Sequence, residues 1–248
     1  MRLSRLHVDL ALTPGAEIDL PSAQARHAVQ VLRLERDATL VLFNGDGYDY
    51  LARLIDLGRE RARVLIESRG DLEPESRLDI HLALGISKGE RMEFAIQKAV
   101  ELGVTRIRPL FTHRSQVRLD GARRDKRLEH WHGVVVAACE QSGRRRLPVL
   151  EPAVDLESWL ETVQGQGLTK GLLLDPLAEL ALPALPAPES GLTLLIGPEG
   201  GLDPRERDLA RRHGFQGVRL GPRILRTETA PLAAIAVIQA LWGDFRDP

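Results

Sequence analysis

Two glycine-bearing segments near the end of the chain carry the residue types best suited to hold a small cofactor. Leu194–Gly201 reads Leu-Leu-Ile-Gly-Pro-Glu-Gly-Gly, and Leu220–Ala230 reads Leu-Gly-Pro-Arg-Ile-Leu-Arg-Thr-Glu-Thr-Ala. Glycine lets a backbone approach a ligand closely and adopts positive φ, and exposed amides at a helix N-terminus favour polar or anionic groups. Side by side, the two segments would wall a pocket with backbone. Alone, the first fits an ordinary strand-to-helix turn better.

The second segment adds charged groups that suit catalysis. Arg223 and Arg226 bracket two apolar residues and precede Glu228. Two arginines beside a carboxylate can bind a phosphate or stabilise charge that develops in a transition state. They are equally suited to an Arg–Glu ion pair at the start of the last helix, with Thr229 as its N-cap. From these residues alone, both interpretations stay open.

Several other chemistries are disfavoured by the sequence. There is neither a G-x-x-x-x-G-K-[ST] loop nor a G-x-G-x-x-G fingerprint, so the common phosphate-binding motifs are absent. His130 and His132 are two residues apart on a predicted helix and do not share a face, so no metal site is expected. Cys139, the single cysteine, is expected to be a buried core residue rather than a nucleophile.

The composition predicts a globular protein of the reducing cytoplasm. The chain has 248 residues, of which 43% are hydrophobic and only 4% aromatic, so its core must consist of aliphatic side chains. One cysteine excludes an internal disulfide framework. The N-terminus lacks the apolar core of a signal peptide, and no stretch reaches the roughly 18 apolar residues of a membrane span. No membrane partner is therefore expected.

A net charge of −1 conceals an uneven distribution of charge. The chain has 30 arginines and four lysines, and residues 103–146 contain eleven basic and four acidic side chains. Arginine offers a planar fork for phosphate and stacks on bases, so this segment suggests a face for nucleic acid. Solvated surface charge is the alternative.

Element patterns divide the chain into residues 1–70, a linker over 71–77, and residues 78–248. In the first part, Ser22 is expected to cap a helix that runs to Leu34, and Asn44–Gly47 is a hairpin turn signal. Strands are expected at Ala38–Phe43, Leu51–Leu57 and Ala62–Glu67, which suggests a small β-barrel.

The second part alternates strands and helices, which indicates an α/β domain with a mostly parallel sheet. Strands are expected at Asp79–Ile86, Arg106–Phe111, Leu172–Leu174, Thr193–Ile196 and Val218–Leu220. Helices are expected at Glu90–Leu102, Leu128–Gln141, Asp155–Val163, Asp203–Gly214 and Pro231–Trp242. Asp203-Pro204-Arg205-Glu206 predicts a capping box with proline at the first helical position.

Motifs along nearly the whole chain, together with the two glycine-bearing segments, resemble those of the 16S rRNA (uracil-1498-N3)-methyltransferase family, in the SPOUT class of knotted methyltransferases. The other matching positions are Arg2, His27, Val31–Arg33, Lys88–Glu93, Gln97–Val104, Pro109, His113–Ser115, Ala138–Arg144 and Pro148. Three positions depart from the family pattern: Ala28, Arg36 and Leu202 stand where histidine, glycine and phenylalanine are frequent.

The resemblance implies a PUA-like β-barrel over residues 1–70 and a SPOUT domain over 78–248, with a trefoil knot near 194–230. It implies a homodimer that methylates N3 of uridine 1498 in 16S rRNA of the small ribosomal subunit, with S-adenosylmethionine as cofactor. The implied cofactor residues are Leu195, Ile196, Gly197, Pro198, Glu199, Gly200, Gly201, Leu220, Gly221, Ile224, Leu225 and Thr227. The implied RNA contacts are Arg2, Arg5, Arg33, Lys88, Arg91, Arg114 and Arg144.

This reaction demands a proton acceptor or charge stabilisation, because N3 of neutral uracil carries a proton. We hypothesise Arg226 and Arg223 as electrostatic or phosphate contacts and Glu228 as the base, with a structural role for Glu228 as the alternative. Two other functions stay open: a non-catalytic RNA-binding or ribosome-assembly factor, and a related SPOUT enzyme that acts on another RNA or on a ribose 2′-OH.

Overall fold

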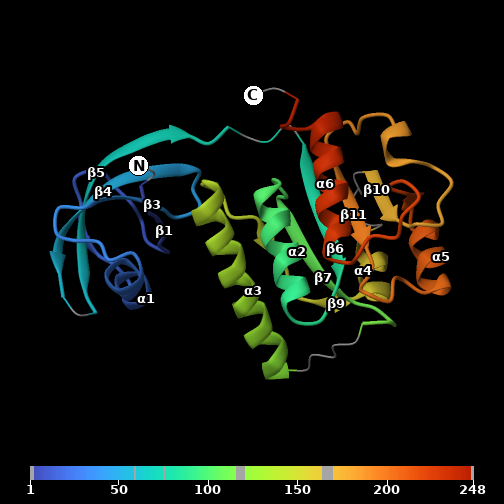
Figure 1. Cartoon of the computed structure of the whole chain (residues 1–248), viewed down its shortest axis with the longest axis horizontal. Helices are drawn as coiled ribbons and strands as arrows, with labels where there is room; N and C mark the ends of the chain where they lie inside the picture. The colour runs from blue at the N-terminus through green and yellow to red at the C-terminus, as the bar shows by residue number, and fades with distance from the viewer. Residues whose placement is uncertain are drawn as a thin grey trace. The chain divides into compact units, whose positions relative to one another are not determined.

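The computed structural model describes residues 3–58, 60–74, 76, 78–115, 121–163 and 170–246 (Figure 1). The chain divides into two compact units. The first comprises Met1–Glu75 together with Cys139–Leu147, and the second comprises Ser76–Ala138 together with Pro148–Pro248. Arg2, an expected RNA contact, lies outside the described residues.

The first unit contains a five-stranded sheet of order β1-β3-β4-β5-β2. Its strands are β1 (Arg5–His7), β2 (Glu17–Asp19), β3 (Thr39–Phe43), β4 (Tyr48–Leu57) and β5 (Ala62–Leu72). β1 pairs with β3 in parallel and the other pairs are antiparallel. The hairpin turn between β3 and β4 forms where Asn44–Gly47 predicts it, with φ of 91° at Gly45 and 94° at Gly47.

The expected helix from Ser22 to Leu34 forms only in part. An α-helix, α1 (Ser22–Arg26), passes into a π-helical turn, His27–Val31, and Arg33 adopts a φ of 50°. The prediction that Ser22 caps this helix is wrong, because Pro21 occupies the N-cap position and makes no side-chain capping bond.

The segment 139–147 packs within the first unit, although the expected range 78–248 assigns it to the second. Glu73 Oε2 accepts hydrogen bonds from the backbone N–H groups of Arg145 and Arg146 at 2.9 and 2.7 Å. Glu140 Oε1 accepts from the backbone of His7 at 2.9 Å. Cys139 is fully buried as expected, and burial raises the pKa of its thiol to about 11, which makes it a poor nucleophile.

The second unit contains a parallel sheet of order β12-β10-β11-β6-β7-β8, with β9 also paired to β7. Its strands are β6 (Asp79–Gly85), β7 (Arg106–Phe111), β8 (Val149–Leu150), β9 (Val154–Asp155), β10 (Lys170–Leu174), β11 (Gly191–Ile196) and β12 (Gln216–Val218). Every residue of β11 is buried, as expected for a central parallel strand covered on both faces. The predicted α/β architecture with a mostly parallel sheet is confirmed.

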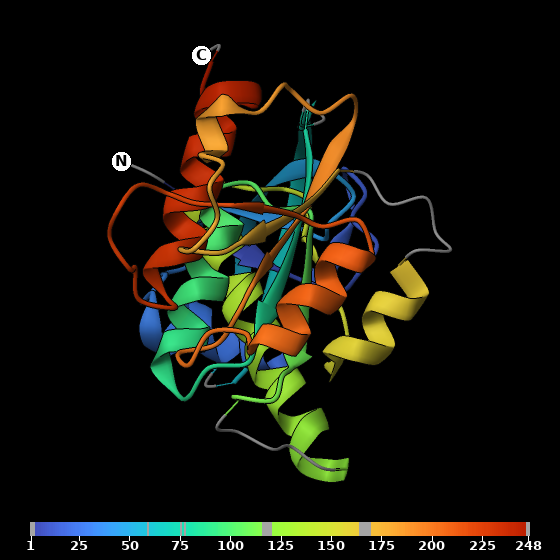
Figure 2. The ribbon, with the colours of Figure 1, turned by 90° about the vertical axis from the view of Figure 1, so that its right-hand side faces the viewer.

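Helices cover both faces of this sheet (Figure 2). They are α2 (Glu90–Glu101), α4 (Leu156–Val163), α5 (Pro204–Arg212) and α6 (Thr229–Trp242). A further helix, α3 (Gly121–Ser142), belongs to this unit as far as Ala138. α2 packs with α6 on one face, and α4 packs with α5 on the other. The capping box predicted at Asp203 and Glu206 is present at the start of α5. The prediction of Thr229 as an N-cap is wrong, because Glu228 occupies that position.

We expect Leu82→Ala to destabilise the second unit by about 2–5 kcal/mol, the usual cost of a cavity in a closed core. Leu82 is fully buried in β6 and pairs in register with Leu194 of β11. Urea unfolding measures the change. Leu177→Ala is the matched control, because Leu177 is 74% exposed and its loss should change stability by less than about 0.5 kcal/mol. Equal effects of the two variants would contradict the burial described here.

Candidate functional site

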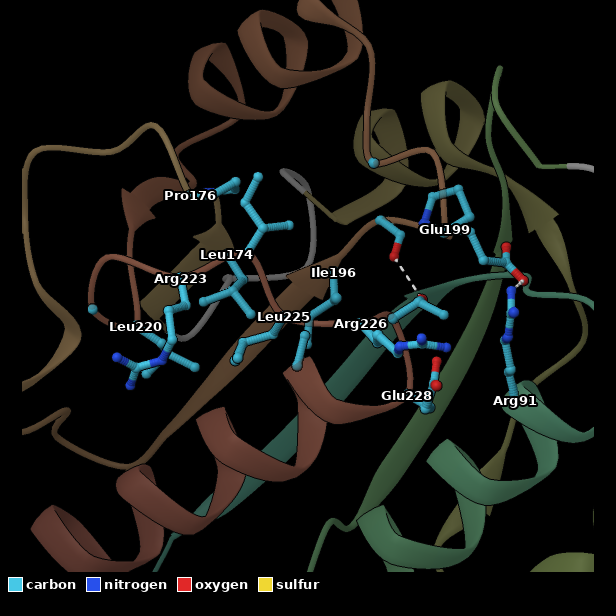
Figure 3. Close-up of a pocket in the computed structure, with 17 residues that line it drawn as sticks. Arg91, Leu174, Pro176, Ile196, Glu199, Leu220, Arg223, Leu225, Arg226 and Glu228 are labelled. Atoms are coloured by element: carbon cyan, nitrogen blue, oxygen red, sulfur yellow. Dashed lines mark hydrogen bonds and ion pairs between the residues drawn. The ribbon is translucent and has the colours of Figure 1, made fainter.

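A pocket of about 260 Å³ lies at the carboxyl ends of β10 and β11, between the two glycine-bearing segments (Figure 3). This edge is where ligands bind in open parallel sheets. The pocket is lined by Arg91, Leu174, Pro176, Ile196, Gly197, Pro198, Glu199, Gly201, Leu220, Gly221, Arg223, Ile224, Leu225, Arg226, Thr227, Glu228 and Ala230. The structure therefore brings together the two segments that the sequence singled out.

The loop after β11, residues 197–201, is tight enough to require glycine. A Cβ on Gly197 would lie 2.7 Å from the backbone N of Leu202, a distance that real Cβ atoms do not show. Gly201 has a φ of 64°, and its N–H donates to the Pro198 carbonyl at 2.8 Å. Backbone rather than side chain thus forms this wall of the pocket, as the sequence predicts.

Two buried hydroxyl groups fasten this loop to two other segments. Thr227 Oγ1 donates to the Gly197 carbonyl at 3.3 Å, and Ser87 Oγ lies 3.0 Å from Thr227 Oγ1. Either hydroxyl can donate in the second bond, and Ser87 Oγ also lies 3.5 Å from the Gly85 carbonyl. Both side chains are buried. Ser87, which follows β6 and lies far from Thr227 along the chain, is not among the residues that the sequence motifs single out.

The segment 220–228 supplies the opposite wall and runs into α6. Gly221 has a φ of 69°, and the Arg226 carbonyl accepts from the N–H groups of Thr229 and Ala230 at 2.9 Å each. Ile224 lines the pocket but is 85% exposed. Arg226 and Glu228 lie side by side at one end of the pocket, whereas Arg223 lies near Leu220 at the other (Figure 3).

Two carboxylates line the pocket, and each has a buried oxygen without a protein partner: Oε2 of Glu199 and Oε2 of Glu228. Glu199 Oε1 accepts from the backbone N–H of Lys88 at 2.9 Å and faces Arg91 Nη1 at 3.4 Å. Burial opposes ionisation of Glu199, but these backbone hydrogen bonds and the Arg91 charge outweigh it and lower the pKa of Glu199. Glu199 therefore stays ionised at neutral pH.

Two expected cofactor residues do not line the pocket. Leu195 is fully buried in the core beside Trp159 and Phe215, because side chains alternate across the strand and Ile196 faces the pocket instead. Gly200 lies under the side chain of Arg114. Conversely, Leu174, Pro176 and Ala230 line the pocket without having been selected. Leu174 and Pro176 could have been found from the sequence, because they lie where β10 ends, at the same edge of the sheet.

The side chains expected to contact RNA differ in their exposure and in their contacts within the protein. Arg5 forms an ion pair with Asp49 at 2.5 Å and donates to the Arg144 carbonyl at 3.1 Å, and its side chain is only 8% exposed. Arg33 and Lys88 are exposed. Arg91 lines the pocket, and Arg114 Nη1 donates to the Gly200 carbonyl at 2.8 Å.

Part of the basic segment 103–146 is neutralised within the fold. Arg106 and Arg108 both pair with Glu151, at 2.8 and 2.7 Å. Arg145 pairs with Asp49 at 3.2 Å. Counting charges along the sequence therefore overstated the free positive charge of this segment, because Glu151 and Asp49 lie outside it.

Over the described ranges, no three His, Cys, Asp or Glu side chains gather as a metal site would require. Over the same ranges, no helix combines the length and apolar character needed to cross a bilayer.

Comparison with known proteins matches both parts of the chain. The family model for the RNA methyltransferase domain matches residues 74–239, and that for the RNA methyltransferase PUA domain matches residues 20–67. Ribosomal RNA small subunit methyltransferase E of Buchnera aphidicola (from Schizaphis graminum) is 33% identical over 98% of each chain. The chain belongs to the ribosomal RNA small subunit methyltransferase E family. The family inferred from the sequence motifs is thereby confirmed.

Solved structures agree with this family assignment. Methyltransferase E from Neisseria gonorrhoeae, bound to S-adenosyl methionine, is 40% identical, with 98% of this chain and 100% of that chain covered and a TM-score of 0.90. A Legionella pneumophila methyltransferase in complex with the cofactor SAM is 38% identical over the same shares, with a TM-score of 0.94.

We expect Thr227→Val to destabilise the second unit by about 1–3 kcal/mol, because the Gly197 carbonyl would lose a hydroxyl donor and the Ser87 hydroxyl would lose one of its two partners. Thr227→Ser keeps the hydroxyl and should retain most of the stability. Thermal unfolding of the two variants measures the difference. Equal loss in both would mean that the threonine methyl group, not the hydroxyl, matters.

We expect the stabilisation from Glu199 ionisation to depend on pH. Because folding lowers the pKa of Glu199 below its ordinary 4.5, this contribution is present above pH 4.5 and is lost as the pH falls through the folded-state value. The stability difference between the wild type and Glu199→Gln should therefore shrink on acidification. Urea unfolding at a series of pH values tests this, and a constant difference would contradict it.

Proposed function

We propose that this chain transfers a methyl group from S-adenosylmethionine to N3 of uridine 1498 in 16S rRNA. The observation that carries the proposal is the pocket, built from both glycine-bearing segments and containing two buried carboxylate oxygens without a protein partner. Family membership and the S-adenosylmethionine-bound solved relatives support it.

The pocket fits the chemistry of this cofactor. Its apolar wall, from Ile196, Leu220 and Leu225, suits an adenine ring, and the glycine backbone allows close approach. The free Oε2 of Glu199 suits a hydroxyl, amino or sulfonium group of a cationic ligand. In this proposal the cofactor is held by residues 196–201, 220–225 and Thr227. S-adenosylmethionine supplies an electrophilic methyl group when bound.

Arg226 and Glu228 are proposed as the reactive pair, because they lie side by side in the pocket (Figure 3). Removing the N3 proton leaves negative charge on the uracil carbonyl oxygens. The exposed guanidinium of Arg226 stabilises that charge, and the free Oε2 of Glu228 accepts the proton. Arg223, at the other end of the pocket, is assigned to a phosphate contact.

The target base must leave its pairing and stacking before N3 can enter the pocket, because N3 lies on the Watson–Crick edge. Lys88, Arg91 and Arg114 lie in the same unit as the pocket and are proposed to contact the RNA backbone nearby. Arg2, Arg5, Arg33 and Arg144 are proposed to contribute from the first unit. The internal contacts of Arg5 make its share the smallest.

The finer architecture is also proposed. Residues 1–70 would form a PUA-like β-barrel, joined through 71–77 to a SPOUT domain over 78–248. The family model over residues 20–67 supports the first assignment. A trefoil knot near 194–230 and a homodimer complete the proposal. The knot is supported by the resemblance of the motifs in 194–230 to those of knotted methyltransferases and by the family model over residues 74–239.

Incubation with labelled S-adenosylmethionine and unmethylated small ribosomal subunits tests the function. We expect label in 16S rRNA with the wild type. Cofactor binding without transfer would contradict the proposed substrate and favour another RNA. No cofactor binding at all would favour a non-catalytic RNA-binding role.

We expect Glu228→Gln to lower kcat by about 10²–10⁴-fold, the usual loss when a general base is removed. The substitution keeps the size of the side chain, so the affinity for S-adenosylmethionine should change little. Glu179→Gln is the control, because Glu179 is exposed and does not line the pocket. Single-turnover methyl transfer measures the rate. Near-normal turnover in a folded Glu228→Gln variant would exclude Glu228 as the base.

A further inference from the structure

A buried carboxylate outside the pocket holds the loop after β7, residues 112–115, against the start of α5. Glu206 is only 5% exposed. Its Oε2 accepts from the backbone N–H of Asp203 at 2.9 Å, which completes the capping box of α5. Its Oε1 accepts from the backbone N–H of His113 at 2.7 Å. Capping the helix requires only the first of these bonds, so the second has another consequence.

The bond to His113 positions the next residue, Arg114, so that its side chain lies against the loop after β11. Arg114 Nη1 donates to the Gly200 carbonyl at 2.8 Å. The stem of the same side chain covers Gly200 so closely that a Cβ there would lie 3.1 Å from Arg114 Cβ. Gly200 lies between Glu199 and Gly201, which both line the pocket. The Arg114 side chain therefore supports this wall from outside.

The hydrogen bond from Arg114 to Gly200 depends on the hydrogen bond from His113 to Glu206. An exposed arginine loses much side-chain entropy when it holds one geometry, so its hydrogen bond to Gly200 is weak alone. The bond from His113 to Glu206 fixes the backbone from which Arg114 extends, and so lowers that cost. A hydrogen bond to a buried charged acceptor is among the stronger ones, which suits an anchor.

We propose that Glu206 and Arg114 are positioning residues for the cofactor: they hold residues 199–201 in the conformation that binds S-adenosylmethionine. The inference rests on the proposed function and deepens it. It gives Arg114, expected from the sequence to contact RNA, an additional role inside the protein. It also accounts for the tight fit of the Arg114 side chain over Gly200, which itself does not line the pocket.

The test compares Glu206→Gln with Asp203→Ala. The glutamine side chain has one acceptor oxygen and cannot serve both backbone N–H groups, so it breaks the His113 bond or the Asp203 bond. Asp203→Ala removes the side-chain cap of α5 and the 3.4 Å contact to the His113 ring, but it leaves the His113–Glu206 backbone bond in place. Both variants lower stability by weakening the same helix end.

Calorimetric titration with S-adenosylmethionine and thermal unfolding are measured for each variant. We expect Glu206→Gln to raise Kd about 10-fold, the equivalent of one lost hydrogen bond to a charged group, and Asp203→Ala to leave it within about 2-fold. Arg114→Ala should raise Kd to a similar degree, and Arg114→Lys should recover most of the affinity, because a single donor suffices at Gly200. The double variant Glu206→Gln/Arg114→Ala should bind no worse than the weaker single variant.

Three results would overturn the proposal. Wild-type affinity in both Glu206→Gln and Glu206→Ala, of which the second removes both acceptor oxygens, would show that the bond to His113 does not act on the pocket. Equal weakening in Asp203→Ala would show that only the stability of α5 matters. Additive losses in the double variant would show that Glu206 and Arg114 act separately. Absence of S-adenosylmethionine binding in the wild type would instead overturn the proposed function, and this inference with it.

Discussion

The pocket depends on one buried chain of hydrogen bonds, which links the Ser87 hydroxyl, the Thr227 hydroxyl and the Gly197 carbonyl. These residues follow β6, precede α6 and follow β11. The bonds thus join three segments, and the two bonded residues Ser87 and Thr227 are 140 positions apart in the sequence. A buried hydroxyl that loses its partner is costly, so the segments are stable together rather than separately. The two glycine-bearing walls can then face each other at a fixed separation.

Carboxylates anchor three further loop backbones at the carboxyl edge of the sheet. Glu199 holds the loop after β6 through the Lys88 N–H, and Glu206 holds the loop after β7 through the His113 N–H. Asp175, 1% exposed, accepts from Leu177 N at 3.0 Å and from Arg211 at 2.9 Å, and so fixes the loop after β10. Loops are normally the mobile part of such a fold. Here their backbones are anchored, which suits a site that must align N3 with a methyl group.

Sequence reasoning succeeded where the cause is local. The capping box of α5 lies within four residues, and the glycine loop and the hairpin turn are set by their own backbone requirements. It failed where the cause is distant. Ser87 matters only through a residue 140 positions away, and the charges of Arg106 and Arg108 are offset by Glu151 from the next strand region. The packing of residues 139–147 within the first unit likewise depends on tertiary hydrogen bonds, which Glu73 and Glu140 accept. The resemblance names Leu195 as a cofactor residue, but alternation along β11 sends its side chain into the core and not into the pocket.

The central claim is that this pocket methylates N3 of one uridine in 16S rRNA. The most direct measurement is nucleoside mass analysis of 16S rRNA after incubation of unmethylated small subunits with the protein and S-adenosylmethionine, with the modified position mapped along the RNA. We expect 3-methyluridine at position 1498, and over the same incubation time a much lower level there with a folded Glu228→Gln variant. A methyl group on another atom or another nucleotide, or an unchanged level of 3-methyluridine with the variant, would contradict it.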